Sequence, residues 1–182
     1  PQHERFVAEF DRVQEQLVQR PQDRKLDEQR QTAAHRVDTA ELDAAVSGAV
    51  HPGRRRPALK PAMVHGMLKG FIDLVFEHQG RYYVLDYKSN WLGDDLRAYA
   101  HSGLIPAMLE HRYPLQYLFY VLALHRHLGQ RMADYDYDRH FGGVFYLFLR
   151  GMDLAAGNRY GVFHERPPKD FIEALEQYLG GE

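Results

Sequence analysis

The stretch that decides the fold is "GFIDLVFEHQGRYYVLDYKSN", residues 70–90. Two runs of aromatic and β-branched residues bracket the tetrapeptide "EHQG", and Gly80 suits the turn between them. This pattern predicts a β-hairpin whose turn is Gln79-Gly80. The turn also fixes the register, because each residue before it acquires a single partner after it.

One face of the predicted hairpin is entirely apolar. The register places Leu74 opposite Leu85 and Phe76 opposite Tyr83. Side chains alternate between the two faces of a strand, so these four lie on the same side of the sheet. We therefore expect this face to be part of the hydrophobic core.

The other face carries charge inside strands that are otherwise apolar. Val75 pairs with Val84, but Asp73 lies opposite Asp86. Directly opposed side chains have their Cβ atoms about 4.5–5.5 Å apart, and like charges at that spacing destabilise a sheet. Two carboxylates in a partly dry site need a neutralising cation. Lys88, opposite Phe71 on the same face, supplies one charge, and a divalent cation supplies two.

The charged face has two interpretations. A Mg²⁺ held by Asp73 and Asp86 could lower the pKa of a water and polarise a phosphate oxygen, with Lys88 stabilising the developing charge. The chemistry would then be phosphodiester hydrolysis. Alternatively, Lys88 forms a structural ion pair with one aspartate, and the other aspartate lies at the solvent edge. Asp-x-Lys alone often occurs by chance, and the second aspartate strengthens the metal-site hypothesis.

The rest of the chain predicts an α/β fold. Residues 142–151, "GGVFYLFLRG", are apolar on both faces, which is typical of a central strand, and residues 159–164 predict a shorter one. The dense apolar content begins near Met63, so we divide the chain into an N-terminal helical and linker segment, 1–62, and a core domain, 63–182. Periodicity predicts helices at 3–18, 38–48, 95–103, 106–112, 113–129 and 167–181.

Composition narrows the class of protein. The 182 residues include no cysteine, which excludes a disulfide framework, a thiolate zinc site and an iron–sulfur cluster, and which fits a reducing cytoplasm. The apolar runs are too short to cross a bilayer, so we expect no membrane association. The net charge of -2 argues against an independent DNA-binding protein, since these usually carry a basic excess.

Residues 66–76, "GMLKGFIDLVF", and 82–93, "YYVLDYKSNWLG", closely resemble the C-terminal nuclease domain of the RecB subunits of bacterial RecBCD helicase–nucleases. The likeness continues through "HRYPLQYLFYVLALHRHL" (111–128) and "ADYDYDRHFGGVFYLFLRG" (133–151), and it covers roughly residues 63–180. The resemblance implies the restriction-endonuclease-like PD-(D/E)xK fold, a mixed sheet flanked by helices. It also implies a divalent metal, Mg²⁺ first, with Mn²⁺ or Ca²⁺ able to occupy the same site.

The resemblance implies a role for each charged hairpin residue. Asp73 and Asp86 match the family's carboxylate ligands, the main-chain carbonyl of Tyr87 matches a third metal contact, and Lys88 matches the catalytic lysine. Asp73, Asp86 and Lys88 are therefore the expected catalytic residues.

A second motif lies on the predicted helix at 113–129. Gln116 and Tyr120 match the family's Gln-x-x-x-Tyr pattern, which implies that they position DNA. At a spacing of four residues they share a helix face. From the residues alone, Gln116 would be a solvated side chain and Tyr120 a core aromatic.

The chain departs from the family pattern at its N-terminal end. The family's upstream histidine ligand would fall before Pro1, and no motif surrounds the only substitutes, His3 and His35. Glu28 has no convincing strand around it to match the family's glutamate strand. We therefore expect an incomplete metal cage, in a chain that begins like a piece of a longer protein.

The expected function is that of a Mg²⁺-dependent exodeoxyribonuclease that processes double-strand DNA ends for recombinational repair, beside RecC- and RecD-like subunits. ATP would be bound elsewhere in the full-length protein, because this chain has no Gly-x-x-x-x-Gly-Lys-Ser/Thr loop. One alternative is a catalytically incomplete docking module for the RecA recombinase or partner subunits. Another is a stand-alone restriction-like or CRISPR-associated nuclease, which the lack of a basic DNA-gripping region disfavours.

Overall fold

The structure, a computed structural model, describes residues 37–50, 52–54, 63–64 and 70–180. The expected helix at 3–18 lies outside these ranges, as do His3, Glu28 and His35. The division of the chain at residue 62 stays a prediction.

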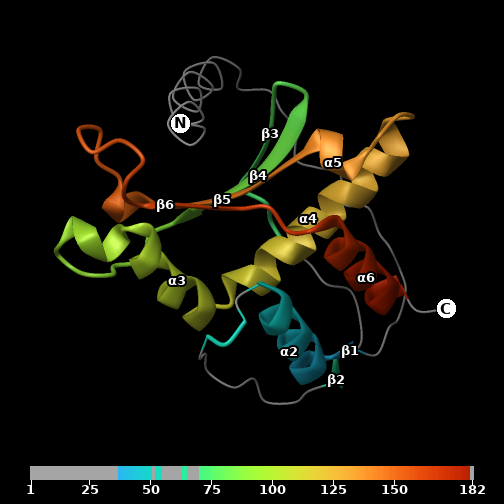
Figure 1. Ribbon diagram of the computed structural model, residues 1–182, viewed down its shortest axis with the longest axis horizontal. Coiled ribbons are helices and arrows are strands. Elements are labelled where there is room, and N and C mark those ends of the chain that lie inside the picture. The colour runs from blue at the N-terminus through green and yellow to red at the C-terminus, as the bar shows by residue number, and fades with distance from the viewer. Residues whose placement is uncertain (1–36, 51, 55–62, 65–69, 181–182) are drawn as a thin grey trace.

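A four-stranded mixed sheet forms the centre of the molecule (Figure 1). Its strands are β3 (Leu74–His78), β4 (Arg81–Lys88), β5 (Phe141–Phe148) and β6 (Val162–Glu165), in that spatial order. The β4–β5 pair is parallel and the two outer pairs are antiparallel. β5 is an interior strand, as its apolar sequence predicted. A separate two-stranded sheet joins β1 (Val37–Asp38) to β2 (Met63–Val64).

Helices α2, α3, α4 and α6 lie on one side of the four-stranded sheet (Figure 1). None of the described helices is both long and apolar enough to span a bilayer. The helical elements are α2 (Thr39–Val50), η1 (Leu96–Tyr99), α3 (His101–Glu110), α4 (Tyr113–Arg131), α5 (Tyr137–His140), η2 (Leu149–Gly151) and α6 (Lys169–Gly180).

Several predicted helix boundaries were wrong. The helix expected at 95–103 is divided between η1 and the start of α3. α2 continues past Gly48 to Val50 and α4 continues past Gly129 to Arg131, because an isolated glycine costs only about 1 kcal/mol inside a helix that packing supports. α3 runs through Pro106, which was expected to start a new helix. Asp38 caps the start of α2, since its Oδ1 accepts the Ala40 amide at 2.8 Å and the Glu41 amide at 3.2 Å.

The predicted hairpin register is confirmed from the turn back to Leu74, the first residue of β3. Leu74 pairs with Leu85 and Val75 with Val84. Gln79 and Gly80 have φ angles of 50° and 74°, the left-handed values that a type I′ turn requires of both central residues. This turn matches the twist of the strands and holds the register without a bulge.

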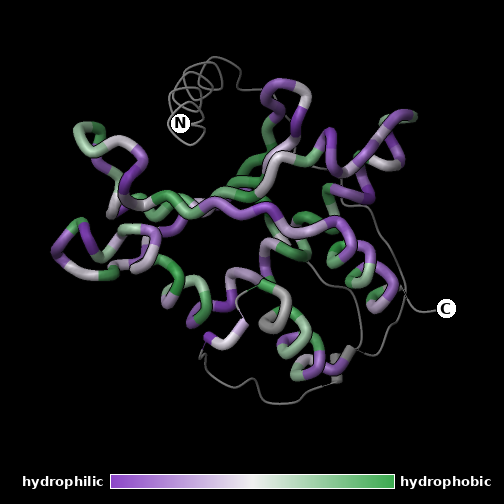
Figure 2. Tube along the Cα trace, viewed as in Figure 1, coloured by the Kyte–Doolittle hydropathy of each residue, from purple (hydrophilic) through white to green (hydrophobic). Residues whose placement is uncertain are grey.

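The sheet separates two apolar layers. The helix-facing layer is larger and includes Val84, Val144 and Tyr146 from the strands, packed with Leu118 and Val121 of α4. The opposite layer is built from strand residues, and it confirms the predicted apolar face of the hairpin. Hydrophobic residues concentrate along the central strands, whereas they alternate with hydrophilic ones along α6 (Figure 2). The buried members of the opposite layer are Phe76, Tyr83, Leu85, Phe145 and Leu147.

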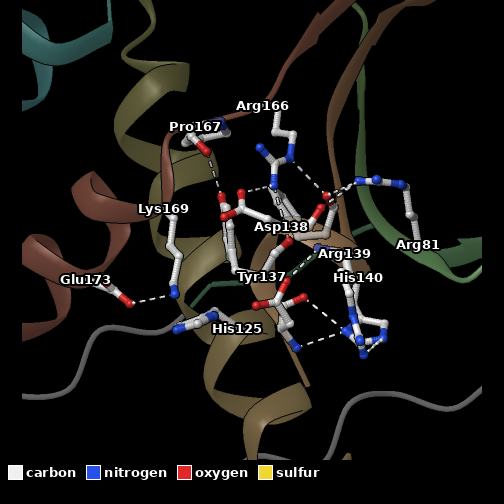
Figure 3. A network of polar contacts seen from close by, with 12 residues as sticks. Arg81, His125, Tyr137, Asp138, Arg139, His140, Arg166, Pro167, Lys169 and Glu173 are labelled. Carbon is white, nitrogen blue, oxygen red and sulfur yellow. Dashed lines mark hydrogen bonds and ion pairs between the residues drawn. The ribbon is translucent and has the colours of Figure 1, made fainter. Parts of the chain in front are cut away.

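Two arginines fasten the amino-terminal ends of the parallel strands (Figure 3). Arg81 Nη1 donates to the carbonyls of Asp138 and Phe141 at 3.1 and 3.3 Å. Arg166 donates to the same Phe141 carbonyl at 3.0 Å and forms an ion pair with Asp138 at 2.8 Å. Its guanidinium also lies over the ring of Tyr137, 5.1 Å from the centroid. The polar side chains at this end of the sheet therefore stabilise the fold, and we look for a functional site at the carboxyl ends of β4 and β5.

α6 should stabilise the fold mainly through the apolar side chains that it buries against the core. Ile172 is fully buried, whereas Leu154 is fully exposed. Ile172→Ala should lower the free energy of unfolding by about 2–5 kcal/mol, because it removes buried methyl groups and leaves a cavity. Urea denaturation measures this loss. Leu154→Ala should change nothing, and equal effects of the two variants would contradict the assigned core.

Glu165 should make stability depend on pH. Burial raises the pKa of Glu165, and a hydrogen bond from the Tyr117 hydroxyl at 2.9 Å opposes this rise only in part. A carboxyl with a raised folded-state pKa stabilises the fold below its ordinary pKa, and that contribution is lost as the pH rises through the folded-state value. The wild type should therefore lose stability relative to Glu165→Gln as the pH rises above the ordinary range of a glutamate, about pH 4. A pH-independent difference in urea midpoints would contradict this.

Candidate active site

Two charged residues of β4, Asp86 and Lys88, lie on its helix-facing side at the carboxyl end of the strand. Asp86 and Lys88 are only 4% and 9% exposed, and they form an ion pair with each other. Burial raises the pKa of Asp86, the hydrogen bond and charge of Lys88 oppose the rise, and the nearby charge of Asp73 adds to it. The site thus contains a desolvated carboxylate beside a desolvated ammonium.

Aromatic rings and an amide enclose the Lys88 ammonium. Its Nζ donates to Gln116 Oε1 at 3.0 Å. The same atom lies 4.0 Å from the ring centroid of Tyr113 and 4.8 Å from that of Tyr146. An aromatic face attracts a cation, more strongly when both are away from water. These contacts hold the ammonium in one place.

Gln116 connects the lysine to the motif on α4. Its Oε1 accepts the Tyr146 hydroxyl at 3.0 Å in addition to Lys88, and its Nε2 donates to the Tyr120 hydroxyl at 2.9 Å. The three bonds fix the orientation of the amide, because the oxygen faces two donors and the nitrogen faces an acceptor. The structure thus brings Gln116 and Tyr120 to the same site as Asp86 and Lys88.

Asp73 lies just before the first residue of β3, and it is exposed. Its Oδ2 accepts the backbone amide of Tyr87 at 2.9 Å. The ladder stops at Leu74–Leu85, so the continuation that would pair Asp73 with Asp86 and Phe71 with Lys88 lies outside the sheet. The side-chain bond to Tyr87 nevertheless holds Asp73 at the end of β4, close enough for its charge to act on Asp86.

The donor set suits a hard divalent cation. Within the described ranges, no group of three or more His, Cys, Asp or Glu side chains could hold a metal. Mg²⁺ needs fewer, since it keeps several waters and is commonly bound through one or two carboxylates. Asp73 and Asp86 supply these, and the Tyr87 carbonyl lies on the strand between the candidate ligand Asp86 and Lys88. The residues present therefore fit Mg²⁺.

Sequence reasoning missed Tyr113, Tyr146 and Asn90. Tyr113 covers Lys88 and donates through its hydroxyl to Asn90 Oδ1 at 3.1 Å, which ties α4 to the loop after β4. A tyrosine at the start of a helix and one in a buried strand give no local signal of this role. The role of Tyr146 could have been predicted only from the register of the β4–β5 pair, which places Tyr146 beside Asp86.

Comparison with protein families agrees with this geometry. The family model described as the PD-(D/E)XK nuclease superfamily matches residues 1–181. The chain belongs to this superfamily. The α/β fold with a mixed sheet, expected from the resemblance, is thereby confirmed.

Several relatives are RecB subunits of the RecBCD enzyme. The chain is 55% identical to that of Escherichia coli (strain K12) over 125 residues, 69% of this chain and 10% of the relative. It is 50% identical to that of Haemophilus influenzae over 65% of this chain and 10% of the relative. For Mycobacterium tuberculosis (strain CDC 1551 / Oshkosh) the values are 47%, 64% and 11%. The likeness to RecB is confirmed, and the chain spans about a tenth of the length of these relatives.

Removing one partner of the buried ion pair should be costly, and removing both should not. Lys88→Met should destabilise the metal-free protein by about 3–5 kcal/mol at neutral pH, because it leaves the Asp86 carboxylate buried without a cation. The loss should shrink as the pH falls, since Asp86 can then take a proton. Urea denaturation measures both effects.

The matched comparisons are a double variant and a surface pair. Asp86→Leu combined with Lys88→Met should restore most of the stability. Arg97→Met, which breaks the exposed Arg97–Asp95 pair, should leave stability unchanged. A double variant as unstable as Lys88→Met would contradict this prediction, because it would show that the ion pair itself stabilises the fold and that an unpaired charge is not the cause of the loss.

Proposed function

We propose that this chain is a metal-dependent DNA nuclease domain that hydrolyses phosphodiester bonds at Asp73, Asp86 and Lys88, with Mg²⁺ as the cofactor. The observation that carries the proposal is the buried Asp86–Lys88 pair at the end of β4, bonded to Gln116 of α4, with Asp73 anchored beside it. Two carboxylates and a lysine at one strand end fit the chemistry of the superfamily to which the chain belongs.

The residues divide the task between them. A bound Mg²⁺ would supply a polarised phosphate oxygen and a water of lowered pKa. Asp73, Asp86 and the Tyr87 carbonyl would hold the ion. Lys88, desolvated and oriented by Gln116, can donate hydrogen bonds to the non-bridging phosphate oxygen on which negative charge develops.

The aromatic groups control geometry and water. The rings of Tyr113 and Tyr146 cover Lys88, so its ammonium meets little water. Gln116 holds the lysine through its oxygen and Tyr120 through its nitrogen. We propose that Gln116 and Tyr120 thereby act as positioning residues between α4 and the DNA backbone.

The proposed setting is a cytoplasmic RecBCD-like helicase–nuclease that processes double-strand ends for recombination and repair. The relatives are named as subunits of the RecBCD enzyme, which supports RecC- and RecD-like partners for the protein containing this chain. Motor subunits that deliver unwound single strands would also explain a nuclease domain with a net charge of -2.

Cleavage of linear single-stranded DNA tests the proposal. The 182-residue chain should cleave a labelled oligonucleotide with Mg²⁺ or Mn²⁺ and should stop on addition of a chelator. Asp86→Ala and Asp73→Ala should abolish detectable cleavage, because each removes a metal ligand. Lys88→Ala should lower kcat by roughly 100-fold or more, with metal affinity retained, because it removes a transition-state donor.

Asp134→Ala supplies the control. Asp134 is an exposed carboxylate whose ion pair with Arg139 lies near the opposite end of the sheet, so its loss should leave cleavage unchanged. Cleavage that survives Asp86→Ala, or that does not depend on a divalent ion, would contradict the proposal.

A docking role is the second candidate, and one surface favours it. Leu149, Met152 and Leu154 are large apolar residues with exposed fractions of 49%, 38% and 104%, and they lie within six residues of each other. We propose this segment as a contact for partner subunits or for the RecA recombinase. A docking module needs no metal at Asp73 and Asp86, so titration with Mn²⁺ separates the two roles.

A further inference from the structure

Two large aromatic side chains are exposed at the edges of the candidate active site. Phe71 is 74% exposed and lies two residues before Asp73, and Trp91 is 65% exposed and lies three residues after Lys88. Most of the other large aromatics in the described part of the chain are buried or half-buried. We call Phe71 and Trp91 the aromatic rim.

The loop that carries Trp91 is anchored on both sides of the indole. Arg150 Nε donates to the Ser89 carbonyl at 2.8 Å. The Asn90 side chain accepts the Tyr113 hydroxyl, and the Leu92 amide donates to the Tyr99 hydroxyl at 3.0 Å. Residues 89, 90 and 92 are thus held in place around Trp91, and the indole between them is exposed.

The segment that carries Phe71 is anchored to the Gln-x-x-x-Tyr motif. The Phe71 backbone is in hydrogen-bond contact with the Tyr120 hydroxyl. A Cβ atom at Gly70 would lie 2.9 Å from Cε1 of the same ring, so a glycine is needed for the chain to pass this close. Both rim residues are thus fixed to α4 residues of the site, Phe71 through Tyr120 and Trp91 through the Asn90–Tyr113 bond.

The surroundings of Trp91 suit a nucleic-acid strand. Arg150 is exposed and lies against the backbone of the loop, so a cation accompanies the indole. An exposed aromatic ring beside a cationic group is the combination with which proteins bind single strands, through base stacking and phosphate contacts. A protein partner would more often use a contiguous apolar patch without an accompanying cation.

We propose that the aromatic rim is a base-stacking subsite for single-stranded DNA, in which Trp91 and Phe71 each stack on a nucleobase flanking the phosphate at Asp86 and Lys88. The inference rests on the proposed nuclease function and deepens it. Stacking is tolerant of base identity because every base has an aromatic face. The subsite would therefore grip the substrate without imposing a sequence preference.

The rim can be tested without catalysis, because Trp91 is the single tryptophan of the chain. In the presence of a chelator, titrating the full 182-residue chain with an oligothymidine of about 12 nucleotides should quench its tryptophan fluorescence. An abasic strand of the same length keeps the phosphates and lacks the bases, so it should not quench.

Variants give the energetic test, read by anisotropy of the labelled oligonucleotide. Trp91→Ala should raise Kd by roughly 5- to 100-fold, the range expected for loss of one stacked base. Phe71→Ala should act similarly, whereas Trp91→Phe should bind almost as the wild type does. Leu154→Ala controls for loss of an exposed apolar side chain, and equal urea midpoints show that Trp91→Ala remains folded.

The outcomes separate the rim from the proposed function. The aromatic rim is overturned if Trp91→Ala leaves Kd unchanged, or if the abasic strand quenches the wild-type fluorescence as strongly as oligothymidine does. Metal-dependent cleavage that continues in either case leaves the proposed nuclease function intact. The exposed aromatics would in that case be a protein contact. Quenching of the wild-type fluorescence by oligothymidine, together with weaker binding by Trp91→Ala, supports the aromatic rim. If cleavage is then absent with every metal tested, that absence contradicts the nuclease function and not the rim.

Discussion

The buried ion pair between Asp86 and Lys88 is the constraint on which the rest of the site depends. Two charged groups this far from water are costly unless each finds further partners. Lys88 finds them in the Gln116 oxygen and the faces of Tyr113 and Tyr146. The surroundings of β4 can therefore be understood as the means of keeping one cation and one carboxylate together, at a place where a metal can join them.

The sheet separates its structural end from its chemical end. Arg81 and Arg166 fasten the amino-terminal ends of β4 and β5 by binding the same Phe141 carbonyl. The carboxyl end of β4 carries Asp86 and Lys88, and α4 covers them from the side. Ligands of open α/β sheets bind at the carboxyl ends of strands for the same reason, since the loops there are free to vary. Because the amino-terminal ends of β4 and β5 are held fixed, Asp86 and Lys88 at the carboxyl end of β4 are held in defined positions.

The hairpin was predictable because local chemistry determines it. A Gln79-Gly80 turn fixes the register, and alternation then sorts the strand residues between two faces. The approach of Asp73 to the end of β4 followed, although a side-chain bond to the Tyr87 amide replaces the predicted strand pairing. The rings around Lys88 were not predictable, because Tyr113 and Tyr146 belong to elements far away in sequence. Helix ends were missed where packing outweighed the local preference of a glycine.

The central claim is that Asp73, Asp86 and the Tyr87 carbonyl form one metal site. Anomalous diffraction from crystals of this chain soaked in Mn²⁺ tests it directly, because it locates the ion independently of activity. The account predicts a single strong peak within coordination distance of both carboxylates, with Lys88 moved off Asp86 but still bonded to Gln116. No peak at this site at saturating Mn²⁺, or a peak bound by other residues only, would contradict it.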